Sequence, residues 1–231
     1  MSQYPFTVVS NSEMGFTLLF DAPVGKALSQ YIVDLAKTFR AIWHQGEVEA
    51  IPGYNSLMVL SYSIEKSECL GEMLMLISHF ESGGQSSSRL IEVPVCYDPM
   101  VAKDLESFAW QVNLSVDEVI RRHTAQDYLV HMLGFLPGFL YLGGLDERLH
   151  CPRKSTPDAR VAPGSVGIGG AQTGVYPVAS PGGWHIIGQT AKPFFDPLAE
   201  QPFLAKPLDM IRFIPISLKD FNAQQTQVEN L

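Results

Sequence analysis

The stretch that decides the fold runs from Gly134 to Gly188 and reads GFLPGFLYLGGLDERLHCPRKSTPDARVAPGSVGIGGAQTGVYPVASPGGWHIIG. It holds twelve of the chain's 19 glycines, interleaved with prolines and aromatic residues. Glycine permits positive φ and close backbone approach, whereas proline fixes φ and removes a hydrogen-bond donor. The aromatic rings supply the apolar area that a disordered Gly/Pro segment lacks. The stretch therefore predicts a folded, loop-rich β surface that carries a site.

The β pattern continues on both sides of this stretch. Short apolar runs separated by Gly/Pro turns are typical of a closed barrel or a sandwich. We expect strands at 90–97, 139–142, 165–168, 173–176, 184–187 and 210–214. A helix is expected at 104–110, and a capping box at Ser115–Glu118 predicts the start of another. The tail Asn222–Leu231 is polar and is expected to fray.

The N-terminal part of the chain predicts a separate α/β domain. It contains an apolar strand at 16–20 and helical spacing of apolar residues at 26–39. A β-hairpin at 48–60 and an amphipathic helix at 70–80 follow. The segment Ser82–Ser88 is rich in serine and glycine, as linkers are. We therefore expect an α+β chain, with a small α/β domain at residues 1–88 and a mostly β domain at residues 89–231.

Composition excludes several classes of protein. The hydrophobic content is 46% and the charged content 17%, which fits a sizeable core. A net charge of −8 repels nucleic acid and anionic membranes. We find no signal peptide and no apolar run long enough for a membrane span. Three dispersed cysteines argue against a disulfide framework or a zinc cage. The expectation is a cytoplasmic protein without a metal site.

Familiar catalytic motifs are missing from the sequence. It contains no phosphate-binding loop of the G-x-x-x-x-G-K-[ST] type, no H-E-x-x-H and no G-x-S-x-G. The run Gly167–Gln172 begins like G-x-G-x-x-G, but glutamine stands at its last position and strands flank it. The catalytic residues therefore stay unassigned, and the sequence predicts no self-contained enzyme.

One local anomaly of charge stands out in this acidic chain. Arg148, Arg153, Lys154 and Arg160 lie close together in sequence, and only Asp158 opposes them. Arginine binds carboxylates and phosphates through two parallel hydrogen bonds, and glycine turns present backbone N–H groups to the same anion. The cluster indicates an anion site, or alternatively a solvated loop whose cations pair with the protein's own acids. Composition alone favours the second interpretation.

Polar and aromatic residues of the same stretch also have two interpretations. Gln172 and Tyr176 could orient a bound amide, but both are ordinary partners for turn backbone. Phe135, Phe139 and Tyr141 are expected in the core rather than on a ligand platform, although the glycine spacing could expose one ring.

Two histidines and a cysteine are candidates for chemistry. His123 lies on the apolar face of its predicted helix, so we expect a core histidine rather than a general base. His185 is expected on the strand face opposite to Trp184. Cys151 lies in a basic neighbourhood, but no paired base can be assigned, which disfavours a nucleophile.

The longest motifs resemble one protein family. GFLPGFLYLGGLD, PRKSTPDARVAPGSVGIGGAQTGVYPVASPGGWHIIGQT and the closing FFDP are similar to the family of the 5-oxoprolinase B subunit, which was formerly labelled allophanate hydrolase subunit 1. The same family contains the sporulation histidine-kinase inhibitor. The resemblance is strong from Val93 to Pro197 and extends more faintly to Pro52–Tyr54. It thus covers nearly all of the chain.

The resemblance implies a fold, a reaction and partners. The fold is an N-terminal α/β domain followed by a cyclophilin-like β-barrel. The reaction is the opening of 5-oxo-L-proline to L-glutamate, coupled to hydrolysis of ATP. ATP, with Mg²⁺ as its counter-ion, would be the co-substrate, bound by a partner subunit or shared between it and this chain. The C subunit of 5-oxoprolinase is the expected direct partner and the A subunit the third component. The sequence leaves open whether the isolated chain forms a homodimer, for which surface meant for the C subunit could serve.

The resemblance also places the substrate and anion site. Arg153 and Arg160 would stabilise an anion, and the residues expected to shape the pocket are Gln172, Tyr176, Gly182, Gly183 and Trp184. Two positions depart from the family pattern. The family often has glycines near Asp98–Met100, and a third arginine where Asp158 stands, so this chain has one positive charge fewer at the proposed site.

Two other functions stay open at this point. One branch of the family inhibits a sensor histidine kinase, and a chain without self-contained catalytic motifs fits such a binding module. Peptidyl-prolyl isomerisation follows only from analogy with the cyclophilin fold. We therefore expect a non-autonomous enzyme subunit, with kinase inhibition as the alternative.

Overall fold

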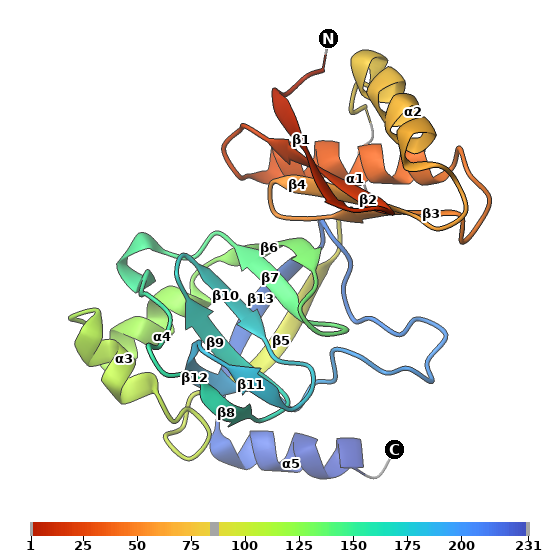
Figure 1. The fold of residues 1–231 in the computed structure, drawn as a ribbon. Helices are drawn as coiled ribbons and strands as arrows, with labels where there is room; N and C mark the ends of the chain where they lie inside the picture. The colour runs from red at the N-terminus through yellow and green to blue at the C-terminus, as the bar shows by residue number, and fades with distance from the viewer. Residues whose placement is uncertain (1, 84–87, 230–231) are drawn as a thin grey trace. The chain divides into compact units, whose positions relative to one another are not determined.

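The structure, a computed structural model, describes residues 2–83 and 88–229. The chain forms two compact units, Met1–Ser87 and Ser88–Leu231 (Figure 1). The linker predicted at 82–88 includes residues 84–87, which lie outside the described residues. In the described part of the chain, no helix has the length and apolar character needed to cross a membrane.

The first unit combines a four-stranded antiparallel sheet with two helices. Its strands are β1 (Phe6–Ser12), β2 (Gly15–Phe20), β3 (Val48–Pro52) and β4 (Ser56–Ser61), in the spatial order β1-β2-β4-β3. The helices are α1 (Lys26–Arg40) and α2 (Lys66–His79). The predicted strand, hairpin and both helices are confirmed. Strand β1 was not predicted, because all its side chains except that of Phe6 are exposed, and no alternation of burial marks the sequence.

The core of the first unit lies between this sheet and its helices. One face of α1 is fully buried, with Tyr31, Ile32, Leu35 and Phe39 among its residues. These side chains belong to the same cluster as Leu18 and the other inward residues of the sheet. The period of the apolar residues in α1 was readable from the sequence because a single face of the helix is buried.

The second unit is built on a closed barrel of seven strands. Its strands are β5 (Leu90–Cys96), β6 (Asp127–Leu133), β7 (Leu140–Gly143), β9 (Ser165–Gly169), β10 (Gln172–Val175), β12 (His185–Gln189) and β13 (Met210–Ile216). The order is β10-β7-β6-β13-β5-β12-β9, and β9 pairs with β10 to close it. Among these described strands, only β5 and β13 pair in parallel. The predicted α+β architecture, with a barrel after a small α/β unit, is confirmed.

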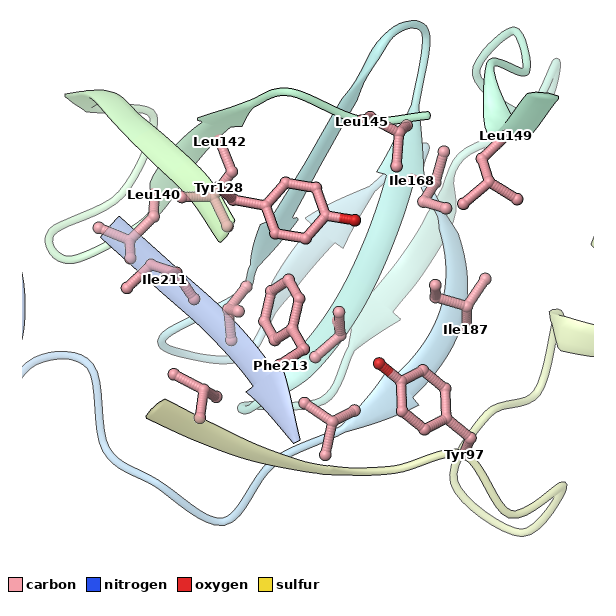
Figure 2. Close-up of a cluster of buried hydrophobic side chains, with 14 of the residues drawn as sticks. Tyr97, Tyr128, Leu140, Leu142, Leu145, Leu149, Ile168, Ile187, Ile211 and Phe213 are labelled. Carbon is pink, nitrogen blue, oxygen red and sulfur yellow. The ribbon is translucent and has the colours of Figure 1, made fainter. Parts of the chain in front are cut away.

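Apolar side chains from all sides fill the barrel. Figure 2 shows the rings of Tyr128 and Phe213 among Leu142, Ile168 and Ile187, all of them buried. A separate two-stranded sheet pairs β8 (Asp158–Val161) with β11 (Ser180–Gly182). This small sheet and β6 were not predicted.

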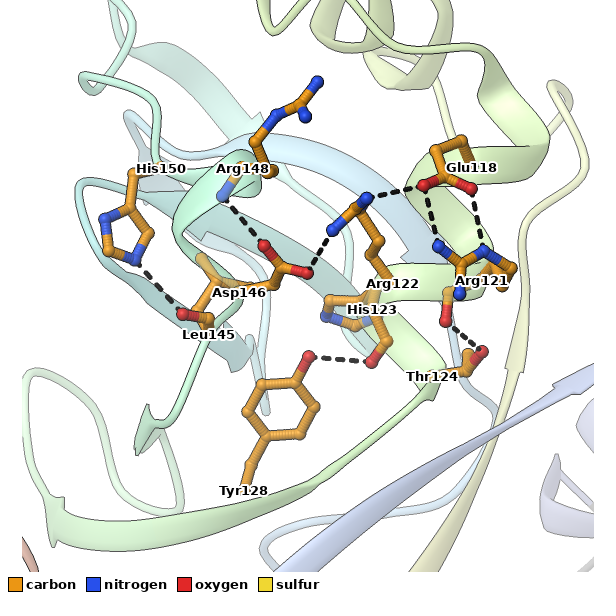
Figure 3. Close-up of polar contacts among 10 residues, drawn as sticks. All are labelled: Glu118, Arg121, Arg122, His123, Thr124, Tyr128, Leu145, Asp146, Arg148 and His150. Carbon is orange, nitrogen blue, oxygen red and sulfur yellow. Dashed lines mark hydrogen bonds and ion pairs between the residues drawn. The ribbon is translucent and has the colours of Figure 1, made fainter.

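The helices of the second unit are α3 (Leu105–Gln111), α4 (Val116–Thr124), the short η1 (Glu147–Leu149) and α5 (Leu218–Glu229). The predicted start of α4 is confirmed, because the Ser115 hydroxyl accepts a hydrogen bond from the Glu118 amide at 3.2 Å, while the Glu118 carboxylate pairs with Arg121 and Arg122. Arg122 pairs with Glu118 at 2.7 Å and with Asp146 at 2.6 Å (Figure 3). Asp146 precedes η1 and belongs to the Gly/Pro-rich stretch, so this arginine connects α4 to that stretch.

The prediction of a frayed tail is wrong for residues 222–229, whereas residues 230 and 231 of that tail lie outside the described residues. Residues from Leu218 to Glu229 form α5, although most of its side chains are polar. The Ser217 hydroxyl accepts a hydrogen bond from the Asp220 amide at 3.2 Å, which caps the first turn. Phe221 is buried and anchors the helix. In the sequence, one capping serine and one apolar ring were not enough to predict a helix in a segment that is otherwise polar.

His123 of α4 enters the barrel core, as predicted. Its ring stacks on Phe213 with centroids 4.6 Å apart. Thr173 donates its single hydroxyl hydrogen to Gly167 O at 3.0 Å, so it accepts from His123 Nε2 at 2.8 Å. Nδ1 of the neutral imidazole then accepts from the Tyr97 hydroxyl at 2.8 Å. Burial lowers the pKa of His123 to about 3.

This histidine makes the stability of the chain depend on pH. Between pH 6.5 and about 3, the unfolded chain binds a proton on His123 that the folded chain does not. The free energy of unfolding therefore falls as the pH falls through this window, by about 1.4 kcal/mol per pH unit for this one group.

We expect the His123→Gln variant to be less stable than the wild type at neutral pH but to lose stability more slowly on acidification below pH 6.5. Urea unfolding at a series of pH values measures both effects. A His123→Gln variant with the full wild-type slope would contradict the burial of a neutral imidazole.

Candidate functional site

A cavity of about 210 Å³ opens in the second unit where the Gly/Pro-rich stretch folds back on itself. Aromatic rings dominate its walls, and we call it the aromatic cavity. The rings belong to Phe135, Phe139, Tyr141, Tyr176 and Trp184. Arg153, Pro157 and the turn Pro181–Gly183 complete the lining. The cavity is thus apolar with one cation in its wall, a combination typical of small-molecule sites.

Trp184 lies directly against the backbones of β9 and β10. A Cβ added at Gly169 would lie 2.6 Å from Nε1 of the Trp184 indole. A Cβ at Gly174 would lie 3.1 Å from Cζ3 of the same ring and 2.5 Å from the carbonyl oxygen of Leu140. No side chain fits at either position without displacing the indole or the neighbouring strand. The two glycines therefore set the depth at which Trp184 lies in the wall.

Tyr176 and Phe139 form the adjoining wall. The Tyr176 hydroxyl would lie 2.5 Å from a Cβ at Gly182, so this glycine makes room for the phenol. The Phe139 ring meets Tyr176 and Trp184 edge-on, with centroids 5.1 and 5.4 Å away. Edge-to-face contacts of this kind hold rings in fixed relative orientation. The aromatic wall is consequently organised before any ligand arrives.

The prediction that Phe135, Phe139 and Tyr141 are core residues is correct for one of them only. Phe139 is buried, Tyr141 is half-buried, and Phe135 is 61% exposed. Phe135 also has φ of +66°, a conformation that costs free energy in a bulky residue. Apolar periodicity cannot separate a core ring from a ring in a cavity wall, since both face inward.

Backbone hydrogen bonds fix the segment that carries Arg153. Cys151 and Gly170 exchange two of them, at 3.1 and 2.7 Å. The Lys154 amide donates to Gly183 O at 2.8 Å. Arg153 lies between these attachment points, one on the β9–β10 turn and one on the turn before Trp184. The guanidinium therefore has a short, well-anchored connection to the wall of the aromatic cavity.

Arg153 presents an unpaired positive charge at this cavity. Its guanidinium carbon lies 5.9 Å from the centroid of the Trp184 ring, a cation–π distance. It forms no ion pair or hydrogen bond with any residue that the structure describes. Burial raises the pKa of Tyr141 and of Tyr176, and the charge of Arg153 acts in the opposite direction on both. An anionic ligand would complete the coordination of this arginine.

The structure brings together most of the residues that the sequence analysis assigned to the site. Those lining the aromatic cavity are Arg153, Tyr176, Gly182, Gly183 and Trp184. Arg160 lies on β8 with its side chain exposed, and Gln172 lies half-buried at the start of β10. Neither of these two lines the cavity. Anion and substrate binding by the assigned residues stays a prediction.

The basic cluster of the sequence is dispersed in the structure. Lys154 is pinned between Asp104, at 3.0 Å, and Asp158. Arg148 is exposed on η1, and Figure 3 shows its guanidinium extending away from Asp146. For Lys154 the interpretation as a cation paired with the protein's own acids is therefore correct. Arg153 is the member that lines the aromatic cavity without an ion-pair partner among the described residues.

Cys151 and His185 lie together but do not form a nucleophile–base pair. His185 Nε2 donates to Pro152 O at 2.9 Å, so this nitrogen carries its hydrogen. The Cys151 Sγ atom is 3.7 Å from the same nitrogen, and burial raises the pKa of the thiol. His185 and Trp184 line different cavities, which agrees with the predicted opposite faces. Among the described residues, no group of three or more His, Cys, Asp or Glu is arranged to hold a metal ion.

Comparisons with known proteins identify the family. Residues 6–205 match the family model described as "Carboxyltransferase domain, subdomain C and D". The chain is 42% identical to the 5-oxoprolinase B subunit of Escherichia coli O157:H7 over 88% of its own length and 93% of the relative's. It is 40% identical to the 5-oxoprolinase B subunit of Bacillus subtilis (strain 168), covering 79% of this chain and 81% of that relative.

A solved structure agrees with this assignment. The crystal structure of TTHA0988 is 33% identical, with a TM-score of 0.77 over 88% of this chain. The chain spans 40% of the length of that protein. Fold and sequence thus give the same assignment, and the chain belongs to the family of the 5-oxoprolinase B subunit.

Proposed function

We propose that this chain is the B subunit of an ATP-dependent 5-oxoprolinase, which opens 5-oxo-L-proline to L-glutamate together with the A and C subunits of that enzyme. The observation that carries the proposal is the aromatic cavity with its unpaired Arg153, in a chain whose relatives are named for this enzyme. The substrate is a small flat ring that carries one carboxylate. An aromatic wall fits the ring, and a free guanidinium fits the carboxylate. None of the findings favours the kinase-inhibitor alternative.

The reaction needs ATP because the lactam is a poor electrophile. Amide resonance protects its carbonyl group, and transfer of the terminal phosphoryl group of ATP to the carbonyl oxygen, with release of ADP, removes that protection. One water then adds to the ring carbon and the C–N bond breaks, leaving an acyl phosphate. A second water releases phosphate and L-glutamate. Phosphoryl transfer depends on positioning and on electrostatic stabilisation of the phosphoryl oxygens.

Residues of this chain would position the substrate. The Arg153 guanidinium binds its carboxylate through two parallel hydrogen bonds. Trp184 and Tyr176 hold the ring and exclude water from the face against which they lie. Arg160 and Gln172 lie outside the cavity and have no part in this proposal. ATP would be bound by a partner subunit or shared between it and this chain.

The reaction would require partner proteins. Phe135 in the lining of the cavity is 61% exposed, and this chain offers no residue recognisable as a catalytic base. A partner covering that ring would exclude bulk water and bring the missing groups. The relatives are named as one subunit of their enzyme, which agrees with such an assembly.

Reconstitution tests the proposed function. The chain purified with its cognate A and C subunits should release glutamate from 5-oxo-L-proline and ATP, and omission of this chain should abolish the release. Assembled, folded components without turnover would overturn the proposal, and inhibition of a sensor histidine kinase would then be assayed next.

Arg153 is the residue to change first. In the assembled complex, Arg153→Ala should lower kcat/KM roughly 10- to 100-fold, because a charge-assisted contact to the substrate carboxylate is lost. Arg148→Ala removes an exposed arginine of the neighbouring η1 and should leave kcat/KM unchanged. Size-exclusion chromatography checks that both variants assemble. Unchanged turnover in Arg153→Ala would remove this arginine from the mechanism.

The wall of the cavity can be tested without its partners. Gly182→Ala places a methyl group 2.5 Å from the Tyr176 hydroxyl and should cost about 1–3 kcal/mol of folding stability by overpacking. At the adjacent Gly183 the nearest atoms to an added Cβ lie 3.8 Å away, so Gly183→Ala should keep the wild-type melting temperature. Thermal unfolding of the two variants makes the comparison. Equal losses would mean that Tyr176 does not occupy the space beside Gly182.

A further inference from the structure

A second cavity, of about 360 Å³, shares Arg153 with the aromatic cavity. We call it the polar cavity. Its walls are Asp104, Ser107 and Gln111 at α3, the segment Pro152–Thr156, and His185. Nothing in the proposed reaction has used this space. Its polar groups divide into those that are already satisfied and those that are not.

The polar cavity has one positive charge that no described acid balances. Lys154 contacts both Asp104 and Asp158, and Lys103 pairs with Asp158 at 2.8 Å. Two ammonium groups and two carboxylates therefore compensate one another. Asp104 is further satisfied by the Ile186 amide, which donates to its Oδ2 at 2.8 Å. Arg153 adds a positive charge that no described acid neutralises, so the cavity carries an excess of one positive charge.

The remaining polar groups of this cavity are mainly donors. Gln111 Oε1 lies 3.5 Å from the Cys151 thiol and accepts from it, which leaves the amide N–H₂ group without a described partner. The hydroxyls of Ser155 and Thr156 make no hydrogen bond to any described residue. The hydrogen of His185 Nε2 is used at Pro152 O. An excess of donors around one extra positive charge selects a ligand that is anionic and rich in acceptors.

We propose that the polar cavity binds an oxyanion group, a phosphoryl or a carboxylate group, between Arg153, Gln111 and the hydroxyls of Ser155 and Thr156. Arginine suits this position because its planar guanidinium has five N–H donors. It lines both cavities and can donate to a ligand in each. The donor arrangement stands without the proposed reaction. The identity of the ligand rests on the proposed function: if the chain takes part in that reaction, the polar cavity holds a phosphoryl group beside the lactam in the aromatic cavity.

Binding of inorganic phosphate to the full chain tests the proposal. Isothermal titration at constant ionic strength should give a Kd in the millimolar range or tighter, and a parallel titration with acetate identifies the source of the oxyanion. Tighter binding of phosphate assigns the site to a phosphoryl group, and tighter binding of acetate assigns it to a carboxylate. No binding of either ion to the folded chain would overturn the proposal.

Variants locate the bound ion. Arg153→Gln should weaken binding about tenfold or more, and Thr156→Val, which keeps the shape of the side chain, should weaken it several-fold. Arg148 is exposed, as Arg153 is, but lines neither cavity, so Arg148→Gln removes the same charge and should leave the Kd within about twofold of the wild type. Equal weakening by Arg148→Gln and Arg153→Gln would mean non-specific attraction and would contradict the site. Melting curves check that each variant is folded. If Arg153→Gln does not fold, the loss of phosphate binding in Thr156→Val tests the site.

The two proposals can fail separately. Phosphate binding that depends on Thr156, with no glutamate release from the reconstituted complex, would keep the oxyanion site and overturn the oxoprolinase function. Glutamate release that is unaffected by Thr156→Val, in a chain that binds neither ion, would keep the function and overturn the oxyanion site.

Discussion

The close contact between the Trp184 indole and the glycine backbones of β9 and β10 determines the shape of the candidate site. At Gly169 and Gly174 any side chain would occupy the volume of the ring or of the neighbouring strand. The indole in turn sets the positions of Phe139 and Tyr176, which meet it edge-on, and of the Arg153 guanidinium above it. The density of glycine in this stretch is thus explained by close packing between backbone and rings, as much as by tight turns.

Charge is distributed so that a cation stays available in the wall of the aromatic cavity. The chain is acidic, with a net charge of −8, and several of its basic side chains near the cavities pair with acids. Lys154, which neighbours Arg153 in sequence, forms ion pairs with Asp104 and Asp158. Backbone hydrogen bonds of Cys151 and Lys154 fix the position of Arg153 in the chain. Its guanidinium contacts the Trp184 ring and no carboxylate that the structure describes, so its N–H donors stay available to a ligand. One unpaired guanidinium in the lining of the aromatic cavity favours a small anion over an extended polyanion.

Much of this architecture could be predicted from the sequence, for physical reasons that differ between elements. Helix α1 has one buried face, so its apolar period was visible, and the strands β9, β10 and β12 are bounded by Gly/Pro turns. Strand β1 and helix α5 were missed because their side chains are mostly exposed and carry little apolar pattern. At the site, the family motif included Trp184 and Arg153. It could not show that Arg153 lines the cavity and Arg160 does not, because the distance of a side chain from a cavity depends on the path of the chain in space. The same reason hid the polar cavity, which joins α3 to a loop about 50 residues further along.

A structure of the chain assembled with the A and C subunits and with bound 5-oxo-L-proline tests the central claim most directly. The account predicts that the lactam ring lies in the aromatic cavity against Trp184 and Tyr176, with its carboxylate on Arg153. A lactam bound elsewhere in the assembly, with the aromatic cavity empty or filled by a side chain of a partner, would contradict it.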